Sequence, residues 1–400
     1  MSAAFTPRHP HLAATGTALF ITAAVLILGD DYARHLETHY IHALAPLTMP
    51  LKNQGVALPR VALAQPDLLP LYGSSELVKD VPDKASLFFK KYPTDFAVFP
   101  VGKAGTTSLV ILQKLAAVGP EIRERKVAIS ISPGWFFTEA IPAHYYEGNF
   151  SVLQAREFIG NGNIDPTLRR DAARRMLDFP ESLARHPLLA FTLRRLAGNS
   201  PVDRALCEVT RPLCALESTL IEFQDHFRTV VFILIERHHV RLLHRRHELV
   251  FNWARLLAHA RQQTEASGID PARDAEAPWH ARVVGGDAGF LETLARAHEW
   301  NDLELLLRGL RDLGVKPLLL SMPINGPYYD RIGVSPAARA AYYARLRALA
   351  EKYEMPLADF RAHEEDRNFL VDHHDHLSAE GWMYYNAALD AFFHHRPLPL

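Results

Sequence analysis

A serine pair in the first quarter of the chain has the residue types and setting that acyl transfer requires. Residues 73–77 read GSSEL and follow a short apolar run, which predicts a buried strand that turns at Gly73 into a helix. At such a junction Ser75 presents its hydroxyl and its own N–H together, and the helix start favours an oxyanion. Ser74 would still belong to the strand and point to the other face. Taken alone, Ser-Ser before a helix is more often an ordinary N-cap.

The C-terminal end of the chain supplies the groups that a nucleophilic serine needs. Residues 372–382 read DHHDHLSAEGW and precede the last expected helix. Serine is a weak nucleophile at its free pKa and requires an adjacent base that a carboxylate orients. We therefore predict that Ser75 is the nucleophile and His376 its base. A histidine-rich metal tract is the alternative interpretation of this segment; we expect no metal and no other cofactor.

Three further loops hold candidate binding residues. Gly105 lies in the segment GKAGT after the second expected strand, where a glycine N–H can approach a substrate oxygen as a second oxyanion donor. An ordinary turn glycine is the alternative. Trp135, in SPGWF, and Asn325, in PINGPYY, follow the third and fourth expected strands. We predict that both contact substrate, although they could equally pack beneath the pocket.

The elements that position these residues follow an α/β pattern. Strands are expected at 68–73, 96–101, 126–132 and 315–322 and alternate with helices, which predicts a parallel sheet with helices on both faces. Each candidate loop follows the carboxyl end of a strand, the edge where such sheets bind ligands. Residues 213–267 contain no Gly or Pro and carry apolar residues at helical spacing, which predicts long helices inserted between the third and fourth strands.

The N-terminal segment predicts a membrane anchor. Residues 12–29 are free of charge and approach the roughly 20 residues that span a bilayer as a helix. Arg8 precedes this run and Asp30 and Asp31 follow it, which favours a cytoplasmic N-terminus and an extracytoplasmic remainder. A cleaved signal peptide is the alternative, but the small residues at 43–45 lie far beyond the apolar run. The expected regions are a cytoplasmic N-terminus (1–11), a transmembrane anchor (12–29), a connector (30–66) and a catalytic domain (67–400) with a helical insertion at about 150–298.

Composition excludes some classes of protein and leaves other questions open. The 400 residues are 48% hydrophobic and 22% charged with a formal net charge of -1, so a packed core is expected and nucleic acid is not an expected partner. Cys207 and Cys214 could form a short disulfide or stay as two free thiols. A basic cluster at 238–247 could be a solvated helix face or could meet an acidic partner or anionic headgroups.

Taken in order, these segments resemble the DltD family of D-alanyl-lipoteichoic acid biosynthesis proteins. The resemblance covers most of the chain. It includes the N-terminal anchor and the segments GSSEL, VGKAGTTSL, SPGWF, EWNDLELLLRGLRDLG, PINGPYYDRIG and DHLSAEGW. It implies an SGNH-type, flavodoxin-like sheet in a single-pass extracytoplasmic enzyme. Such an enzyme works with an acyl carrier protein and a membrane O-acyltransferase to place D-alanine on a cell-envelope polymer, with Ser75 as nucleophile and His376 as base.

The sequence departs from the family pattern at two positions. The family motif is Asp-x-x-His-Leu, but His373 stands three residues before His376. We expect Asp372 to be the triad acid, because Asp375 is adjacent to His376 and points badly for an orienting bond. The usual SPQWF is SPGWF here, so an amide is missing at Gly134. Other functions left open are an O-acetyl transferase or esterase acting on an exported polysaccharide and a non-catalytic adaptor for the acyltransferase system.

Overall fold

A five-stranded parallel sheet forms the centre of the protein. The computed structural model describes residues 10–198, 200–239, 247–268, 285–372 and 376–398. The strand order is β2-β1-β3-β4-β5. The strands are β1 (Leu68–Gly73), β2 (Ala97–Gly102), β3 (Lys126–Ile131), β4 (Lys316–Ser321) and β5 (Leu357–Asp359). The expected parallel sheet is confirmed, and β5 is a strand that the sequence analysis did not predict because its three residues are too few to give a pattern.

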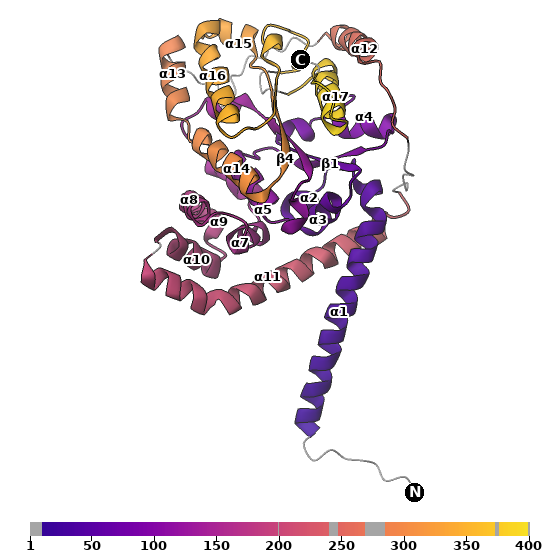
Figure 1. Ribbon diagram of the computed structural model, residues 1–400, viewed down its shortest axis with the longest axis vertical. Helices are drawn as coiled ribbons and strands as arrows, with labels where there is room; N and C mark the ends of the chain where they lie inside the picture. Colours follow the sequence, from indigo (N-terminus) through magenta and orange to yellow (C-terminus); the bar gives the residue numbers. More distant parts are fainter. Residues whose placement is uncertain (1–9, 199, 240–246, 269–284, 373–375, 399–400) are drawn as a thin grey trace.

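Helices cover both faces of this sheet. Side chains alternate along each strand into two cores, so that Leu68 and Tyr72 of β1 enter one core while Leu69 and Leu71 enter the other. The first core includes residues of helices α3 (Ala57–Ala64), α5 (Ser108–Ala116), α14 (Glu299–Leu313) and α16 (Pro336–Lys352). The second includes residues of α4 (Ala85–Lys91), α12 (Trp253–Ala266) and α17 (Ala379–Phe393). Burial on both faces is what an all-parallel sheet requires, and Figure 1 shows the layers.

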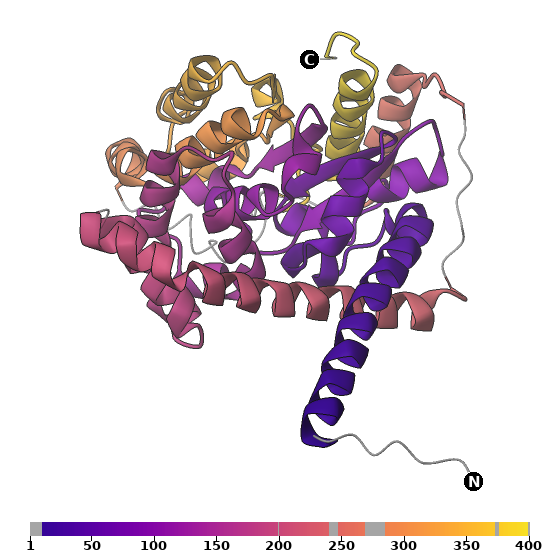
Figure 2. The same cartoon turned by 60° about the horizontal axis from the view of Figure 1, so that its bottom comes forward.

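The predicted helical insertion lies between β3 and β4. Its helices before α12 are α6 (Ala143–Asn149), α7 (Val152–Gly160), α8 (Pro166–Leu177), α9 (Pro180–Leu183), α10 (Pro187–Gly198) and α11 (Pro201–Glu236), and α13 (Gly286–Arg296) follows α12. Helix α11 has 36 residues and runs along one side of the domain (Figure 2). Most of the basic cluster predicted at 238–247 lies outside the described residues.

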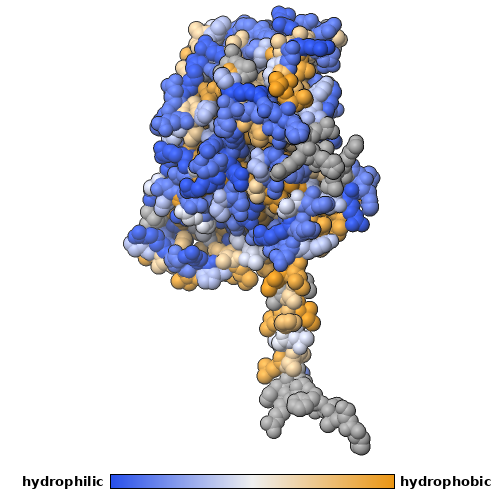
Figure 3. All heavy atoms as spheres, turned by 45° about the vertical axis from the view of Figure 1, so that its right-hand side comes forward, coloured by the Kyte–Doolittle hydropathy of each residue, from blue (hydrophilic) through white to orange (hydrophobic). Residues whose placement is uncertain are grey.

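Helix α1 (Pro10–Leu44) is longer than the predicted anchor. It has 35 residues, and its N-terminal, apolar part stands clear of the domain (Figures 1 and 3). By length and composition this helix could cross a membrane. Its C-terminal part is different, because Ile41 and Leu44 are fully buried in the first core. The chain continues through α2 (Pro50–Gln54) and α3, which also pack on the domain, so the residues that follow the apolar run are folded.

Cys207 and Cys214 both lie on α11. Seven residues of helix separate them along the axis by roughly 10 Å. A disulfide needs Cα atoms within about 7 Å of each other. The two residues are therefore free thiols, and of the two alternatives that the sequence left open, the disulfide is excluded by their positions on one helix.

Gly102 lies where strands β1 and β2 approach too closely for a side chain. It pairs with Gly73, and a Cβ added at Gly102 would lie 1.9 Å from the Gly73 carbonyl oxygen. We expect Gly102→Ala to lower the free energy of unfolding by about 1–3 kcal/mol, because the backbone must shift. Gly148→Ala is the matched control, since an added Cβ there meets nothing within 4 Å. Thermal unfolding should show a lower Tm for Gly102→Ala only; equal Tm values would contradict this close approach.

Candidate active site

Three of the loops that carry candidate site residues begin at the same edge of the sheet, beside strand β1. Strand β1 lies between β2 and β3. The chain therefore passes from β1 to β2 on one side and then crosses to β3 on the other side of β1, which makes a topological switch point beside β1. In open parallel sheets, ligands bind at the carboxyl ends of the strands beside such a switch point. The loops that follow Gly73, Gly102 and Ile131 all begin at this edge. The topology therefore places the candidate residues of the first three loops at the edge where a ligand site is expected.

Ser75 begins a short 3-10 helix directly after β1. This helix, η1, spans Ser75–Leu77, and Ser75 is half-buried at the edge of the sheet. Ser74 is buried, and its backbone N–H donates to Oε1 of buried Glu76 at 2.9 Å. Glu76 thus fixes the turn that leads into Ser75. The sequence analysis did not assign any role to Glu76.

His376 and Asp372 lie against Ser75 in a hydrogen-bonded series. Nε2 of His376 is 2.9 Å from Oγ of Ser75, and Nδ1 of His376 is 2.8 Å from Oδ2 of Asp372. The backbone N–H of His376 also points to Oδ1 of Asp372, at 3.3 Å. An isolated antiparallel bridge between Leu370 and Leu377 closes this loop and brings its two ends together. The competing residue, Asp375, lies outside the described residues.

Lys79 provides a second partner for the carboxylate of Asp372. Its Nζ donates to Oδ2 at 2.9 Å, although the lysine side chain itself is 43% exposed. Burial alone would raise the pKa of Asp372, but the hydrogen bonds and positive charges of His376 and Lys79 outweigh burial and hold the pKa well below its usual range. Asp372 is therefore an anion at any physiological pH. The sequence analysis missed Lys79, because the contact joins residues far apart in the chain.

This arrangement suits proton transfer from the serine hydroxyl. In the tautomer that carries its proton on Nδ1, His376 donates to Asp372 and leaves Nε2 free to accept the proton of Ser75. The Asp372 anion stabilises the imidazolium that then forms. Chemically, the series can generate a serine nucleophile and return the proton to a leaving group.

The glycine loop after β2 is held in place by a buried amide. Gly105 has a φ of +84°, and the Thr106 N–H donates to the Lys103 carbonyl at 3.1 Å, which makes a turn that requires glycine at this position. Asn149 accepts from the Thr106 hydroxyl at 3.0 Å and donates to the Ala104 carbonyl at 3.0 Å. Asn149 is therefore a positioning residue for the loop. It escaped the sequence analysis because it lies in the helical insertion.

Trp135 and Asn325 differ in their placement. Trp135 lies in the short 3-10 helix η3 (Pro133–Phe136), and its ring meets that of Tyr145 edge-on at 5.3 Å. A Cβ added at Gly105 would lie 2.5 Å from Tyr145, so Trp135 and the glycine loop flank the same tyrosine. Asn325 is buried, and its Oδ1 accepts from the Tyr328 N–H at 3.1 Å as the cap of α15 (Gly326–Arg331). Helix capping explains this amide, and substrate contact at Asn325 stays a prediction.

Buried Glu299 lies beneath the site. It lines a cavity of about 10 Å³ together with Ser74 and Trp135, and its Oε1 accepts from the Ser108 N–H at 2.8 Å. Burial, reinforced by the nearby carboxylate of Asp302, raises the pKa of Glu299 above its usual value. A carboxyl group of this kind stabilises the fold less as pH rises above its unfolded pKa, because the unfolded chain releases the proton more readily.

We therefore expect Glu299→Gln to stabilise the protein in alkaline solution. Glutamine keeps an acceptor for Ser108 and has no proton to lose, so the gain in unfolding free energy should be on the order of 1 kcal/mol above neutral pH and small near pH 4. Glu292→Gln, at an exposed glutamate paired with Arg296 on the surface, should show no such pH dependence. Tm measured across pH distinguishes the two. A uniform loss of Tm in Glu299→Gln would indicate an ionised Glu299.

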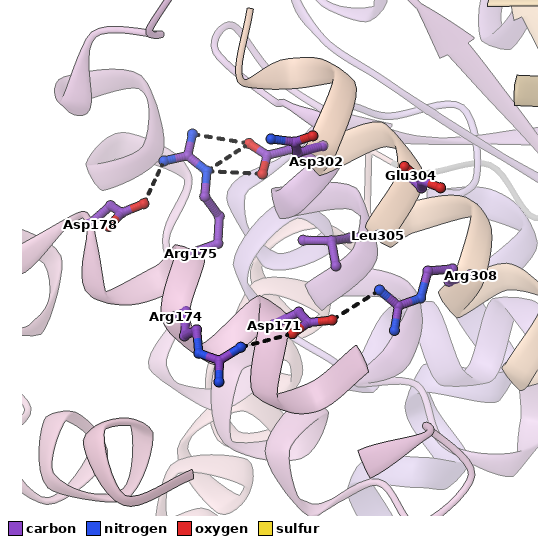
Figure 4. A pocket seen from close by; sticks show the side chains of 9 residues that line it. Asp171, Arg174, Arg175, Asp178, Asp302, Glu304, Leu305 and Arg308 are labelled. Atoms are coloured by element: carbon purple, nitrogen blue, oxygen red, sulfur yellow. Dashed lines mark hydrogen bonds and ion pairs between the residues drawn. The ribbon is translucent and has the colours of Figure 1, made fainter. Parts of the chain in front are cut away.

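A larger cavity of about 370 Å³ lies between α8 and α14, away from the triad (Figure 4). It is lined by Asp171, Arg174, Arg175, Asp178, Asn301, Asp302, Glu304, Leu305 and Arg308. Arg175 pairs with Asp302 at 2.9 Å, and Asp171 pairs with both Arg174 and Arg308. The arginines are thus matched by neighbouring carboxylates, and the cavity carries no excess charge that would attract an anion. We assign it a structural role.

Fold and site together define the class of protein. It is an α/β protein with a five-stranded parallel sheet of flavodoxin-like strand order, and its carboxyl edge carries a serine, a histidine and an aspartate hydrogen-bonded in series.

Comparison with known proteins gives the family. The model of the family described as DltD protein matches residues 47–394. Protein DltD of Bacillus subtilis (strain 168) is 27% identical over 353 residues, which cover 86% of this chain and 87% of that protein. Protein DltD of Staphylococcus aureus (strain NCTC 8325 / PS 47) is 22% identical over 343 residues, which cover 82% of each. The chain belongs to the DltD family, as the resemblance of its motifs indicated.

Proposed function

We propose that this protein is a membrane-anchored, extracytoplasmic serine acyltransferase or thioesterase that takes part in D-alanylation of a cell-envelope polymer. The observation that carries the proposal is the series of hydrogen bonds from Ser75 through His376 to Asp372. Membership of the DltD family supports D-alanine as the acyl group and a teichoic-acid-type polymer as the acceptor. The partners are then an acyl carrier protein and a membrane O-acyltransferase.

The proposed reaction has two steps, acylation of Ser75 and then transfer or hydrolysis of the acyl group. Oγ of Ser75 attacks the carbonyl carbon of a D-alanyl ester or thioester while His376 Nε2 takes the hydroxyl proton. In this proposal, the backbone N–H groups of Ser75 and Gly105 stabilise the oxyanion. Collapse expels the alcohol or thiol, which receives the proton from His376, and leaves D-alanyl-Ser75. A polymer hydroxyl then attacks this ester in the same way, or water does so in hydrolysis, and Ser75 regains its proton.

The anchor in this proposal is an uncleaved α1. Residues 43–45, the segment that resembles a cleavage site, are buried, and Leu44 and Ala45 pack in the first core. Cleavage there would remove Ile41 and Leu44 from that core and leave a cavity, a change that costs several kcal/mol for large apolar side chains. An anchor that stays attached therefore agrees with the packing at its C-terminal end.

Orientation can be tested with a fusion. Because acidic residues follow the apolar run and Arg8 precedes it, alkaline phosphatase fused after Leu400 should be active, since this enzyme folds only outside the cytoplasm. A cytoplasmic reporter fused at the same point should be inactive. The reverse pattern would place the catalytic domain in the cytoplasm and contradict the proposed localisation.

The acyl group can be identified by trapping the intermediate. The full-length protein in detergent would be mixed with a radiolabelled D-alanyl thioester, and in parallel with the acetyl thioester, and quenched in acid. We expect acid-stable label from the D-alanyl compound and none in Ser75→Ala. Label from the acetyl compound alone would favour an O-acetyl transferase or esterase. Absence of label from both compounds would favour the non-catalytic adaptor.

A further inference from the structure

Helix α11 carries an apolar stripe on the face that it turns away from the domain. The stripe follows helical spacing over almost the whole helix, so it forms one continuous face. Its exposed members are Val202, Val209, Leu213, Leu216, Leu220, Phe227, Val231, Leu234 and Ile235. A helix of 36 residues is roughly 54 Å long. An exposed apolar surface of this length is larger than a soluble protein usually leaves in water and indicates a binding surface.

The acidic residues of α11 are mostly turned toward the domain. Asp203 pairs with Arg195 at 3.0 Å, Glu217 with Arg156, and Glu222 with Arg60. Buried Asp225 accepts the backbone N–H groups of Val56 and Ala57 at 2.7 and 2.9 Å. These contacts lie on the face that packs on the domain, so most of the negative charge of the helix is neutralised there.

The charges left on the exposed side of α11 are mainly basic. Arg204, Arg211 and Arg228 are exposed, and the exposed Glu208 is paired with Arg211 at 3.4 Å. A helix with an apolar stripe and basic residues on its polar face is typical of a helix that lies in the interface of a bilayer with anionic lipids. Contact with water alone does not explain why most of the acidic residues of α11 face the domain while its exposed charges are mainly basic.

Helix α1 places α11 at the level of a membrane surface. His226 of α11 lies 2.8 Å from Glu37 and 3.7 Å from Asp30, and a Cβ added at Gly29 would meet the ring of Phe223. The two helices therefore cross where the apolar run of α1 ends. Figures 1 and 2 show α11 along the side of the domain from which the apolar part of α1 leaves. In Figure 3, hydrophobic atoms gather along this lower margin, around the base of α1.

We propose that α11 is an in-plane membrane helix, with its apolar stripe inserted among lipid acyl chains and its arginines at anionic headgroups. The inference rests on the proposed anchoring of α1, which fixes the height of the bilayer. Once α1 spans the membrane, the interface lies against α11 without any further component, which favours lipid over a partner protein. A single spanning helix lets a domain tilt and swivel, whereas a second contact about 54 Å long sets its orientation. The function of α11 is then to hold the active site at a fixed height above the lipid.

Spin-label accessibility in vesicles tests this placement. The full chain, with Cys207→Ser and Cys214→Ser to remove native thiols, would carry one label at Leu213→Cys, Leu220→Cys or Phe227→Cys. The vesicles would contain phosphatidylcholine and phosphatidylglycerol. Phe20→Cys in α1 is the control for a lipid-buried site, and Leu291→Cys on α13 is the control for an exposed site on the domain. The measurement is collision of each label with oxygen, which enters lipid, and with a nickel chelate, which stays in water.

We expect the three α11 labels to lose collisions with the nickel chelate and to gain collisions with oxygen, as at Phe20, while Leu291 stays open to nickel. If the α11 labels behave like Leu291 while Phe20 is lipid-buried, the proposal for α11 is wrong and the anchor stands. Protection of the α11 labels from both reagents would mean contact with a second copy of the chain and would also overturn the lipid assignment. Nickel collisions at Phe20 would overturn the anchor itself.

Discussion

Ser75→Ala should eliminate D-alanyl transfer to the envelope polymer. Oγ of Ser75 lies 2.9 Å from Nε2 of His376, and alanine removes this atom, which forms the acyl bond in the proposed reaction. Loss of the nucleophile from a comparable triad in serine proteases lowers kcat on the order of 10⁶-fold. In a strain that lacks the chromosomal gene, the variant should leave polymer D-alanyl esters at the level of the empty vector. The measurement is the D-alanine released from isolated envelopes by mild base.

Ser74→Ala is the matched control for this change. Ser74 is buried, and its hydroxyl lies 3.5 Å from the Lys103 carbonyl oxygen, which is a weak contact. Its removal should cost no more than about 1 kcal/mol of stability and should keep most of the D-alanyl ester. Equal protein levels of both variants in the membrane fraction exclude a folding defect. Full D-alanylation by Ser75→Ala would support the adaptor function instead.

Asp372→Asn should have the second-largest effect. The carboxylate of Asp372 accepts from Nδ1 of His376 and from Lys79, whereas asparagine replaces one of its two accepting oxygens with an NH2 donor and removes the negative charge. Asparagine would favour the wrong tautomer of the base, and the equivalent change in a protease triad costs on the order of 10⁴ in kcat. The expected result is slow acylation of Ser75 by a D-alanyl thioester, measured by single-turnover quenching, with an unchanged Tm to exclude unfolding.

Asp375→Asn serves as the comparison for Asp372. If Asp372 orients the base, Asp375→Asn should keep a rate close to that of the parent protein. Since Asp372 stays ionised far below neutral pH, the Asp375 variant should also keep the parent's pH profile above pH 5. A large loss in Asp375→Asn with a small loss in Asp372→Asn would reassign the orienting carboxylate.

The sheet could be predicted because each of its four six-residue strands appears in the sequence as an apolar run followed by turn residues. In a parallel sheet both faces are buried, so β1 and β3 appear in the sequence as continuous hydrophobic segments. Strand β5 has three residues, and its pairing with β4 depends on tertiary contacts that local sequence does not encode. The same limit applies to α1, whose apolar part was evident, whereas its continuation to Leu44 depends on packing against the domain.

The candidate site was predictable where chemistry restricts the residue type. Few residues can act as nucleophile and base, so Ser75 and His376 could be selected by type and by their places at the ends of expected elements. Lys79, Glu76 and Asn149 could not be selected in this way. They act through hydrogen bonds to other residues of the site, and common surface or capping roles would explain their types equally well.

The most direct test of Ser75 as nucleophile is the position of a covalent adduct. The full-length protein would be treated with a serine-directed fluorophosphonate, digested, and analysed by mass spectrometry. The account predicts one adduct, on Oγ of Ser75, that forms at a much lower rate in His376→Ala and is unchanged in Ser74→Ala. An adduct on Ser74 or on another residue, or a rate that does not depend on His376, would contradict it.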